Sequence, residues 1–176
     1  MKLLSEKQAL AKLSTLRSVF QQTIKRDYER KAKNCLTCET QGACCLDTHF
    51  VNVHITRLEA AAIRNTLAKL SEQHQAEIDR RVDETVKKYD LSRSGDTFLQ
   101  MFACPLFEKG TGCLVHNEGK PFPCIQHACY ENREDLPPDE LLAKQECRVE
   151  KLNRLTYGRT ARWLPLPVAI QSPRPD

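Results

Sequence analysis

The first part of the chain alternates apolar and polar residues at the period of an α-helix. Its apolar positions fall three or four residues apart and are Leu10, Leu13, Leu16, Phe20 and Ile24. A stripe of this kind is typical of a helix that buries one face, so we expect a helix over residues 5–33. Its basic end suits the negative end of the helix dipole, and we expect those side chains to face solvent.

Two further helices are indicated in the middle of the chain. Thr56 and Glu59 have the spacing of a capping box, in which each side chain accepts a hydrogen bond from the other residue's backbone N–H, and apolar positions at helical spacing follow them. A second stripe predicts another helix over about 71–89. That stripe consists of Ile78, Val82 and Val86.

Shorter elements are expected on both sides of these helices. The alternation of residues 50–55 predicts a short strand, and we expect a second short strand over 98–103. The stretch 104–129 contains three glycines and three prolines, which indicate turns. Pro138 and Gly158 then bracket a helix, because proline is favoured at a helix start and glycine just after its end.

These elements predict a mainly α fold, with a helical scaffold, two Cys-rich loops and at most short β-hairpin strands. We expect three segments: an N-terminal helix over 1–33, a cysteine-cluster domain over 34–158 and a Pro-rich tail over 159–176. The composition of the tail predicts that it runs extended along the surface or is partly disordered.

Nine cysteines in a chain of 176 residues need a chemical explanation, because a domain of this size folds without cross-links. An odd number cannot pair completely. Polar residues interrupt the N-terminal apolar run that a secretory signal would need, and no stretch is long and apolar enough to span a membrane. We therefore expect a cytoplasmic protein, in which disulfides are rare, and we interpret the cysteines as metal ligands.

Eight of the cysteines form two clusters in expected loops, and we predict all eight as metal ligands. They are Cys35, Cys38, Cys44 and Cys45 in the first cluster, and Cys104, Cys113, Cys124 and Cys129 in the second. Cys35 and Cys38 have the C-x2-C spacing, which lets two sulfurs reach one ion at roughly 2.3 Å. Zinc and iron–sulfur clusters both accept four cysteines, so the spacing leaves the metal open.

The number of sites also stays open at this point. Neighbours such as Cys44 and Cys45 point to opposite sides of an extended chain, so either they serve two sites or one of them packs instead of ligating. Eight thiols suffice for two sites of four ligands, or for one cluster with thiols to spare. His127 is an alternative ligand, because neutral imidazole binds zinc. Cys147 is expected to be incidental, unless its helix face packs on the metal site.

Five segments follow one another in an order known from a protein family. They are CLTCETQGACC (35–45), ITRLEAAAI (55–63), CPLF (104–107), GCLVH (112–116) and PFPC (121–124). This order resembles the YkgJ-like, CxxCxxCC-type family, whose members are described as zinc- or iron-chelating. The resemblance implies metal chelation, with an iron–sulfur cluster in some members. It spans residues 35–129 and leaves the N-terminal helix and the tail outside.

Two features depart from the family pattern. Five residues, instead of two, separate Cys38 from the Cys44–Cys45 pair, which lengthens the loop. Lys120 stands where the family has arginine before Pro121, so the positive charge is kept but the bidentate guanidinium is lost.

The sequence therefore predicts a metal-binding protein that holds zinc or an iron–sulfur cluster through cysteine thiolates, with a role in redox chemistry or metal handling. The alternative is a protein-interaction module built on structural zinc. No hydrolase triad, phosphate-binding loop or His-Glu-x-x-His helix occurs, so catalysis is the weakest hypothesis and no catalytic residue is assigned. The expected partners are a metal ion and a protein; a net charge of +4 does not favour nucleic acid, and no membrane partner is expected.

Overall fold

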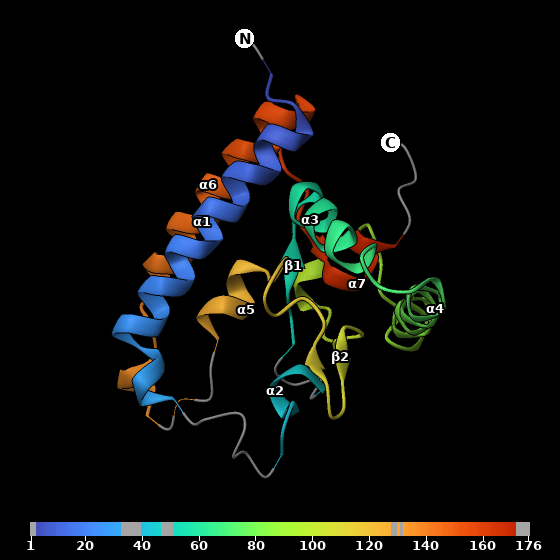
Figure 1. Cartoon of the computed structure of the whole chain (residues 1–176), viewed down its shortest axis with the longest axis horizontal. Helices are drawn as coiled ribbons and strands as arrows, with labels where there is room; N and C mark the ends of the chain where they lie inside the picture. Colours follow the sequence, from blue (N-terminus) through green and yellow to red (C-terminus); the bar gives the residue numbers. More distant parts are fainter. Residues whose placement is uncertain (1–2, 33–39, 47–50, 128–129, 131, 172–176) are drawn as a thin grey trace. The chain divides into compact units, whose positions relative to one another are not determined.

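The structure is a computed structural model that describes residues 3–32, 40–46, 51–127, 130 and 132–171 (Figure 1). Helices make up most of the described chain, and the named strands in it are two residues long. The strands form two antiparallel pairs, one of β1 with β4 and one of β2 with β3. The predicted mainly α fold with short hairpin strands is therefore confirmed.

The chain divides into two compact units, each assembled from two separate stretches of sequence. Unit 1 consists of Met1–Gln41 and Lys120–Ala161, and unit 2 consists of Gly42–Gly119 and Arg162–Asp176. This division differs from the three segments expected from the sequence, because those segments followed composition along the chain and not packing in space.

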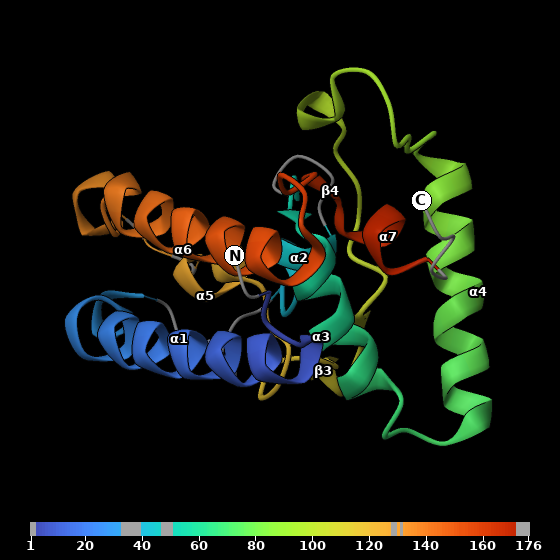
Figure 2. The same ribbon diagram turned by 90° about the horizontal axis from the view of Figure 1, so that it is seen from above.

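Unit 1 is built on two long helices that lie side by side (Figures 1 and 2). They are α1 (Glu6–Asp27) and α6 (Asp139–Tyr157). The short helix α5 (Phe122–Gln126) contacts both, and the Phe122 ring lies 5.6 Å from the ring of Phe20 on α1. The 3-10 turns η1 (Glu29–Lys31) and η4 (Arg133–Asp135) complete the unit.

The ends of these two helices follow from their capping residues. Ser5 caps α1 through a capping box with Gln8. α1 ends at Asp27, earlier than predicted, because the chain tightens there into the η1 turn. Pro138 precedes α6, and Gly158 follows it with a φ of +73°, a left-handed conformation that glycine adopts at little cost. The predicted bounds of α6 are therefore confirmed.

Unit 2 contains the helices α3 (Arg57–Leu67) and α4 (Glu72–Lys88). Thr56 and Glu59 form both hydrogen bonds of the predicted capping box, and both residues are fully buried. The strand β1 (His54–Ile55) precedes α3, within the expected stretch 50–55. The short helix α2 (Ala43–Leu46), the 3-10 turn η3 (Thr97–Leu99), and the strands β2 (Phe107–Glu108) and β3 (Gly112–Cys113) complete this part of the unit.

The C-terminal segment differs from the expected surface tail. β4 (Leu164–Pro165) pairs with β1 in the register His54↔Pro165, and α7 (Leu166–Ile170) contacts α3 and α4. Leu166 and Val168 are each only 2% exposed. The apolar residues between the prolines give this segment enough surface to bury, so residues 164–170 are part of the core of unit 2.

The prediction of a strand over residues 98–103 is also wrong. Residues 97–99 form the η3 turn, and the residues after it have no strand assignment. Phe98 and Leu99 are exposed, whereas Phe102 is fully buried and donates one backbone hydrogen bond to the carbonyl oxygen of Val51. This segment therefore lacks a partner ladder on which its side chains could alternate.

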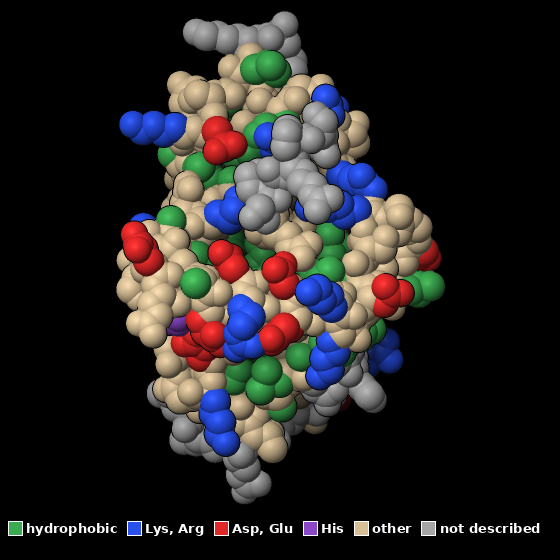
Figure 3. Space-filling view, turned by 90° about the vertical axis from the view of Figure 1, so that its right-hand side faces the viewer, with side chains coloured by type: hydrophobic (Ala, Val, Ile, Leu, Met, Phe, Trp, Pro, Cys, Tyr) green, Lys and Arg blue, Asp and Glu red, His purple; other side chains and the backbone are tan. Residues whose placement is uncertain are grey.

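Charged side chains of both signs lie among one another on the face that Figure 3 shows. In the described part of the chain, no helix combines the length and the apolar composition needed to cross a bilayer.

Candidate metal centre

The structure describes five of the eight predicted ligands. Cys44, Cys45, Cys104 and Cys113 belong to unit 2, and Cys124 belongs to unit 1. Cys35, Cys38 and Cys129 lie outside the described residues. All five described ligands carry thiols and are partly buried.

A backbone hydrogen bond joins the two Cys-rich stretches within unit 2. The N–H of Cys104 donates to the carbonyl oxygen of Cys45 over 2.7 Å. These residues are 59 positions apart in the sequence. The structure therefore brings one cysteine of each cluster to the same place, as the metal-ligand prediction requires.

The Cys44–Cys45 pair lies on a helical turn and not on extended backbone. Both residues belong to α2, and the N–H of Cys45 donates to the carbonyl oxygen of Gly42 over 2.8 Å. Successive side chains on a helix are turned by about 100°, since a turn has about 3.6 residues. The argument that neighbouring cysteines must point to opposite sides therefore does not apply here.

Packing fixes the α2 turn against the strand β2. Gly42 has a φ of +84°, and a Cβ atom at this position would overlap the ring of Phe107. Glycine is thus required twice, once by the left-handed backbone and once by the aromatic ring against its Cα. This contact holds the end of the first Cys-rich stretch beside the hairpin of the second.

The hairpin of β2 and β3 brings Cys104 and Cys113 together. Phe107 pairs with Cys113 in the antiparallel register, and the N–H of Leu114 donates to the carbonyl oxygen of Leu106 over 3.0 Å. The two thiols are close enough that ionisation of one disfavours ionisation of the other.

Cys104 combines a partly buried thiol with nearby backbone donors that would favour a thiolate. Burial raises its pKa to about 12, although backbone N–H groups of Leu106 and Phe107 and the charge of Arg81 act in the opposite direction. Without a cation the buried sulfur therefore keeps its proton. A metal ion would displace that proton, because thiolate is the form that binds metals.

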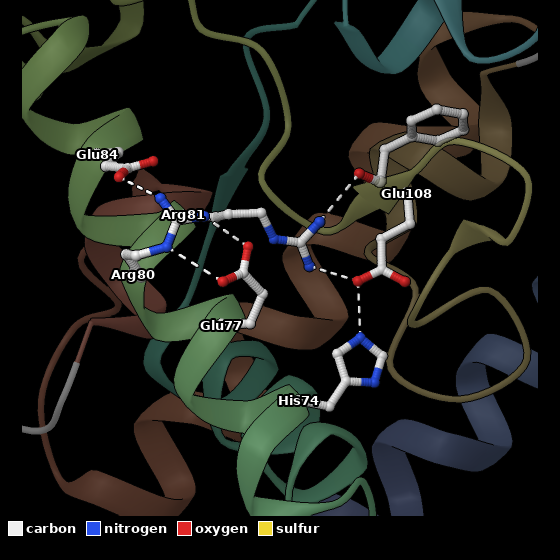
Figure 4. Close-up of polar contacts among 7 residues, drawn as sticks. His74, Glu77, Arg80, Arg81, Glu84 and Glu108 are labelled. Atoms are coloured by element: carbon white, nitrogen blue, oxygen red, sulfur yellow. Dashed lines mark hydrogen bonds and ion pairs between the residues drawn. The ribbon is translucent and has the colours of Figure 1, made fainter.

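A polar network attaches the same hairpin to α4 (Figure 4). The Oε1 atom of Glu108 lies 2.7 Å from Nε2 of His74 and 2.6 Å from Nη2 of Arg81. His74 lies in a polar stretch of the sequence, yet its side chain is only 33% exposed. His74 and Arg81 are seven residues apart, with the buried Ile78 between them. Residues at this spacing lie on one face of a helix, so the sequence pattern could have placed both on the inner side of α4.

In unit 1, described residues that flank the two Cys-rich stretches also meet. Ala32 forms an antiparallel β-bridge with Tyr130, and Nζ of Lys31 lies 2.8 Å from Oδ1 of Asp135. Cys124 lies on α5, five residues after Gly119 ends the preceding stretch of unit 2. The backbone thus links the two stretches inside each unit separately.

Cys147 and the histidines near the Cys-rich stretches are placed less favourably as ligands. His127 is exposed at the end of α5, and His116 is exposed as well. His54 is buried, but its ring stacks on Phe98 with centroids 4.4 Å apart, and burial lowers its pKa. Cys147 is exposed on α6, away from the buried apolar face, as predicted.

The candidate ligands of unit 2 would suit a thiophilic metal, because they are cysteines. Within the ranges that the structure describes, no three His, Cys, Asp or Glu side chains are grouped closely enough to hold a metal ion. The described geometry is therefore a pair of thiols, Cys104 and Cys113, with the backbone of a third cysteine, Cys45, hydrogen-bonded to the first.

Comparison of the chain with protein-family models, with curated proteins and with solved structures found no match in any of the three.

Proposed function

We propose that this protein binds a metal through cysteine thiolates, as zinc or as an iron–sulfur cluster, and that it acts in redox chemistry or metal handling. The observation that carries the proposal is the hydrogen bond between Cys104 and Cys45. It joins the two thiol-rich stretches at the cysteines themselves, where a shared ion would need them. We also propose, from the sequence motifs, that the chain is a YkgJ-like protein.

The donors around Cys104 support this proposal. The backbone N–H groups of Leu106 and Phe107 act to lower the pKa of Cys104, against the larger effect of burial, and so favour the charged form that a metal requires. The fold around the sulfur is held by a two-residue hairpin and by loops, which have few backbone hydrogen bonds of their own. A metal at this place would add stability to the loops, since metal binding and folding are coupled.

Cytoplasmic location is part of the proposal, because thiolate ligands stay reduced there. Four predicted ligands of unit 2 would suffice for one complete site. They are Cys44, Cys45, Cys104 and Cys113.

A second candidate is a protein-interaction module in which structural zinc holds the loops. Phe98 and Leu99, exposed by 58% and 78%, favour it, since neighbouring exposed apolar side chains are typical of binding surfaces. In this case the metal would be zinc without sulfide, and the apolar turn η3 would contact the partner.

The test is analysis of zinc, iron and acid-labile sulfide in protein purified without oxygen. Iron with equimolar sulfide would support the redox function, and zinc alone would support the interaction module. Cys104→Ser should lower the metal content, as should Cys35→Ser and Cys124→Ser, whereas Cys147→Ser should leave it unchanged. Metal-free native protein, or equal metal content in all of these variants, would refute the proposal.

A further inference from the structure

The exposed turn η3 rests on a buried histidine. The ring of His54 on β1 stacks on the ring of Phe98, with centroids 4.4 Å apart and an angle of 21° between the planes. His54 is only 5% exposed, whereas Phe98 is 58% exposed. The side-chain amide of Asn52 also donates to the carbonyl oxygen of Phe98 over 2.5 Å. Two residues of the 52–54 segment therefore hold η3 in place.

The surroundings of the His54 ring suit one ring proton and not two. Its Nδ1 atom lies 3.5 Å from the carbonyl oxygen of Asn52, and because a carbonyl only accepts, Nδ1 carries the proton of the neutral ring. Nε2 is buried and has no hydrogen-bond partner among the described residues. In the neutral ring Nε2 is a lone pair, but in the imidazolium it is an N–H donor. A second proton would therefore bury both a positive charge and an unmatched donor, which is unfavourable.

One charged residue acts on this ring. It is Asp96, exposed directly before η3, and it favours the imidazolium together with two backbone groups. The described elements packed around β1, namely β4, α7 and η3, contain no charged or titratable residue. The buried carboxylate of Glu59 on α3 is directed to the cap residue Thr56. Burial outweighs the effect of Asp96, so the pKa of His54 lies below its ordinary value of 6.5.

We propose that His54 is a pH-sensitive support of the turn η3, which the neutral ring holds in place and the protonated ring releases. When η3 detaches, the ring reaches water and takes up a proton more readily than it does under Phe98. The detached state then binds more protons, so detachment becomes easier as the pH falls below 6.5 and levels off below the pKa of the attached state. Acid would thereby change the exposed apolar surface of Phe98 and Leu99, whether or not a metal is bound elsewhere in the chain.

The experiment follows hydrogen exchange of the full chain by NMR between pH 7.5 and pH 5. The N–H of Gln100 donates to the carbonyl oxygen of Thr97 over 3.1 Å and so reports on the turn. After correction for the intrinsic exchange rate, its protection should be constant above pH 6.5 and fall by up to about tenfold per pH unit below it. In His54→Phe, which keeps a stacked ring but cannot take up a proton, protection should not change with pH. His74→Gln removes a histidine of α4 and, as the control, should behave like the native protein.

The titration of the His54 ring itself tests the inference even if His54→Phe does not fold. Phe98→Ala should expose the ring and move its midpoint up toward 6.5, whereas Leu99→Ala, at a neighbouring site that is 78% exposed, should leave the midpoint in place. Asp96→Asn should lower the midpoint, because it removes the charge that favours the imidazolium. The inference is overturned if the protection of Gln100 stays constant over the whole range, if it falls equally in His54→Phe, or if Phe98→Ala and the native protein share one midpoint.

Discussion

The backbone N–H of Cys104 donates a hydrogen bond of 2.7 Å to the carbonyl oxygen of Cys45. Backbone atoms this close leave two side chains within reach of one ion, provided that both point to the same side. Cys113 pairs in the hairpin of β2 and β3 with Phe107, which lies three residues after Cys104. The hydrogen bond between Cys104 and Cys45 therefore leads to the prediction that Cys45 and Cys104 bind the same metal ion.

We predict that Cys45→Ser and Cys104→Ser each remove the same ion. Because one ion would depend on both sulfurs, the double variant should have the same metal content as either single variant. Metal per chain, measured by elemental analysis after gel filtration, checks this. Two losses that add up would assign the two cysteines to different ions, and Cys147→Ser serves as the exposed control.

The contact between Gly42 and Phe107 predicts a strong effect of a single methyl group. Gly42→Ala should destabilise the protein in two ways, by about 1–3 kcal/mol for the left-handed backbone and by about 1–3 kcal/mol for overpacking against the ring. Gly95→Ala is the control, because Gly95 has a similar φ of +79° but open space around its Cα. Chemical denaturation of the metal-free variants measures the difference.

A smaller side chain at position 107 tests whether overlap with the Phe107 ring causes the loss of stability in Gly42→Ala. Adding Phe107→Leu to Gly42→Ala should recover part of the lost stability, whereas adding it to Gly95→Ala should not. If Gly42→Ala costs no more than Gly95→Ala, the α2 turn does not depend on the ring.

Much of the helical scaffold could be predicted from the sequence, because local signals determine it. Thr56 and Glu59 are three residues apart, and their capping box needs no distant partner. Gly158 likewise ends α6 through its own backbone conformation. Helix stripes carry the same kind of information, since each helix repeats its apolar positions within a few turns.

The parts that sequence analysis missed depend on contacts between distant segments. Whether Leu166 lies on the surface or in the core depends on the packing of α7 against α3 and α4. These helices precede it by many residues in the sequence, so no local pattern reveals the contact. The ion pair of Arg81 with Glu108 also joins separate elements. For the candidate site, the sequence indicated the thiol chemistry, but the partners Cys45 and Cys104 follow only from the packing of α2 on β2.

The C-terminal segment should contribute to stability as a core element. Leu166→Ala should destabilise the protein by about 2–5 kcal/mol, the usual range for a buried leucine that leaves a cavity, since Leu166 is 2% exposed. Leu99→Ala, at a site that is 78% exposed, should change stability by less than about 0.5 kcal/mol. Thermal unfolding monitored by circular dichroism compares the two, and equal effects would place Leu166 outside the core.

The network of Glu108 predicts a specific dependence of stability on pH. The hydrogen bond from His74, helped to a lesser extent by the charge of Arg81, holds the pKa of Glu108 below its usual value near 4.5, against the opposing effect of burial. A carboxyl group with a lowered pKa in the folded state adds stability above its unfolded pKa. That contribution is lost as the pH falls through the folded pKa, when the carboxylate takes up a proton.

Glu108→Gln should therefore be less stable than the native protein at neutral pH, by about 1.5–3 kcal/mol for a hydrogen bond to a charged group. The difference should be largest above the unfolded pKa near 4.5 and should shrink as the pH falls through the lower folded pKa, because the native carboxylate then takes up a proton. Urea denaturation of both metal-free proteins across this range measures it. Glu77→Gln removes an exposed carboxylate of α4 and is the control; its loss of stability relative to the native protein should be smaller. If the loss of stability in Glu108→Gln does not change with pH, the charge of Glu108 does not stabilise the hairpin against α4.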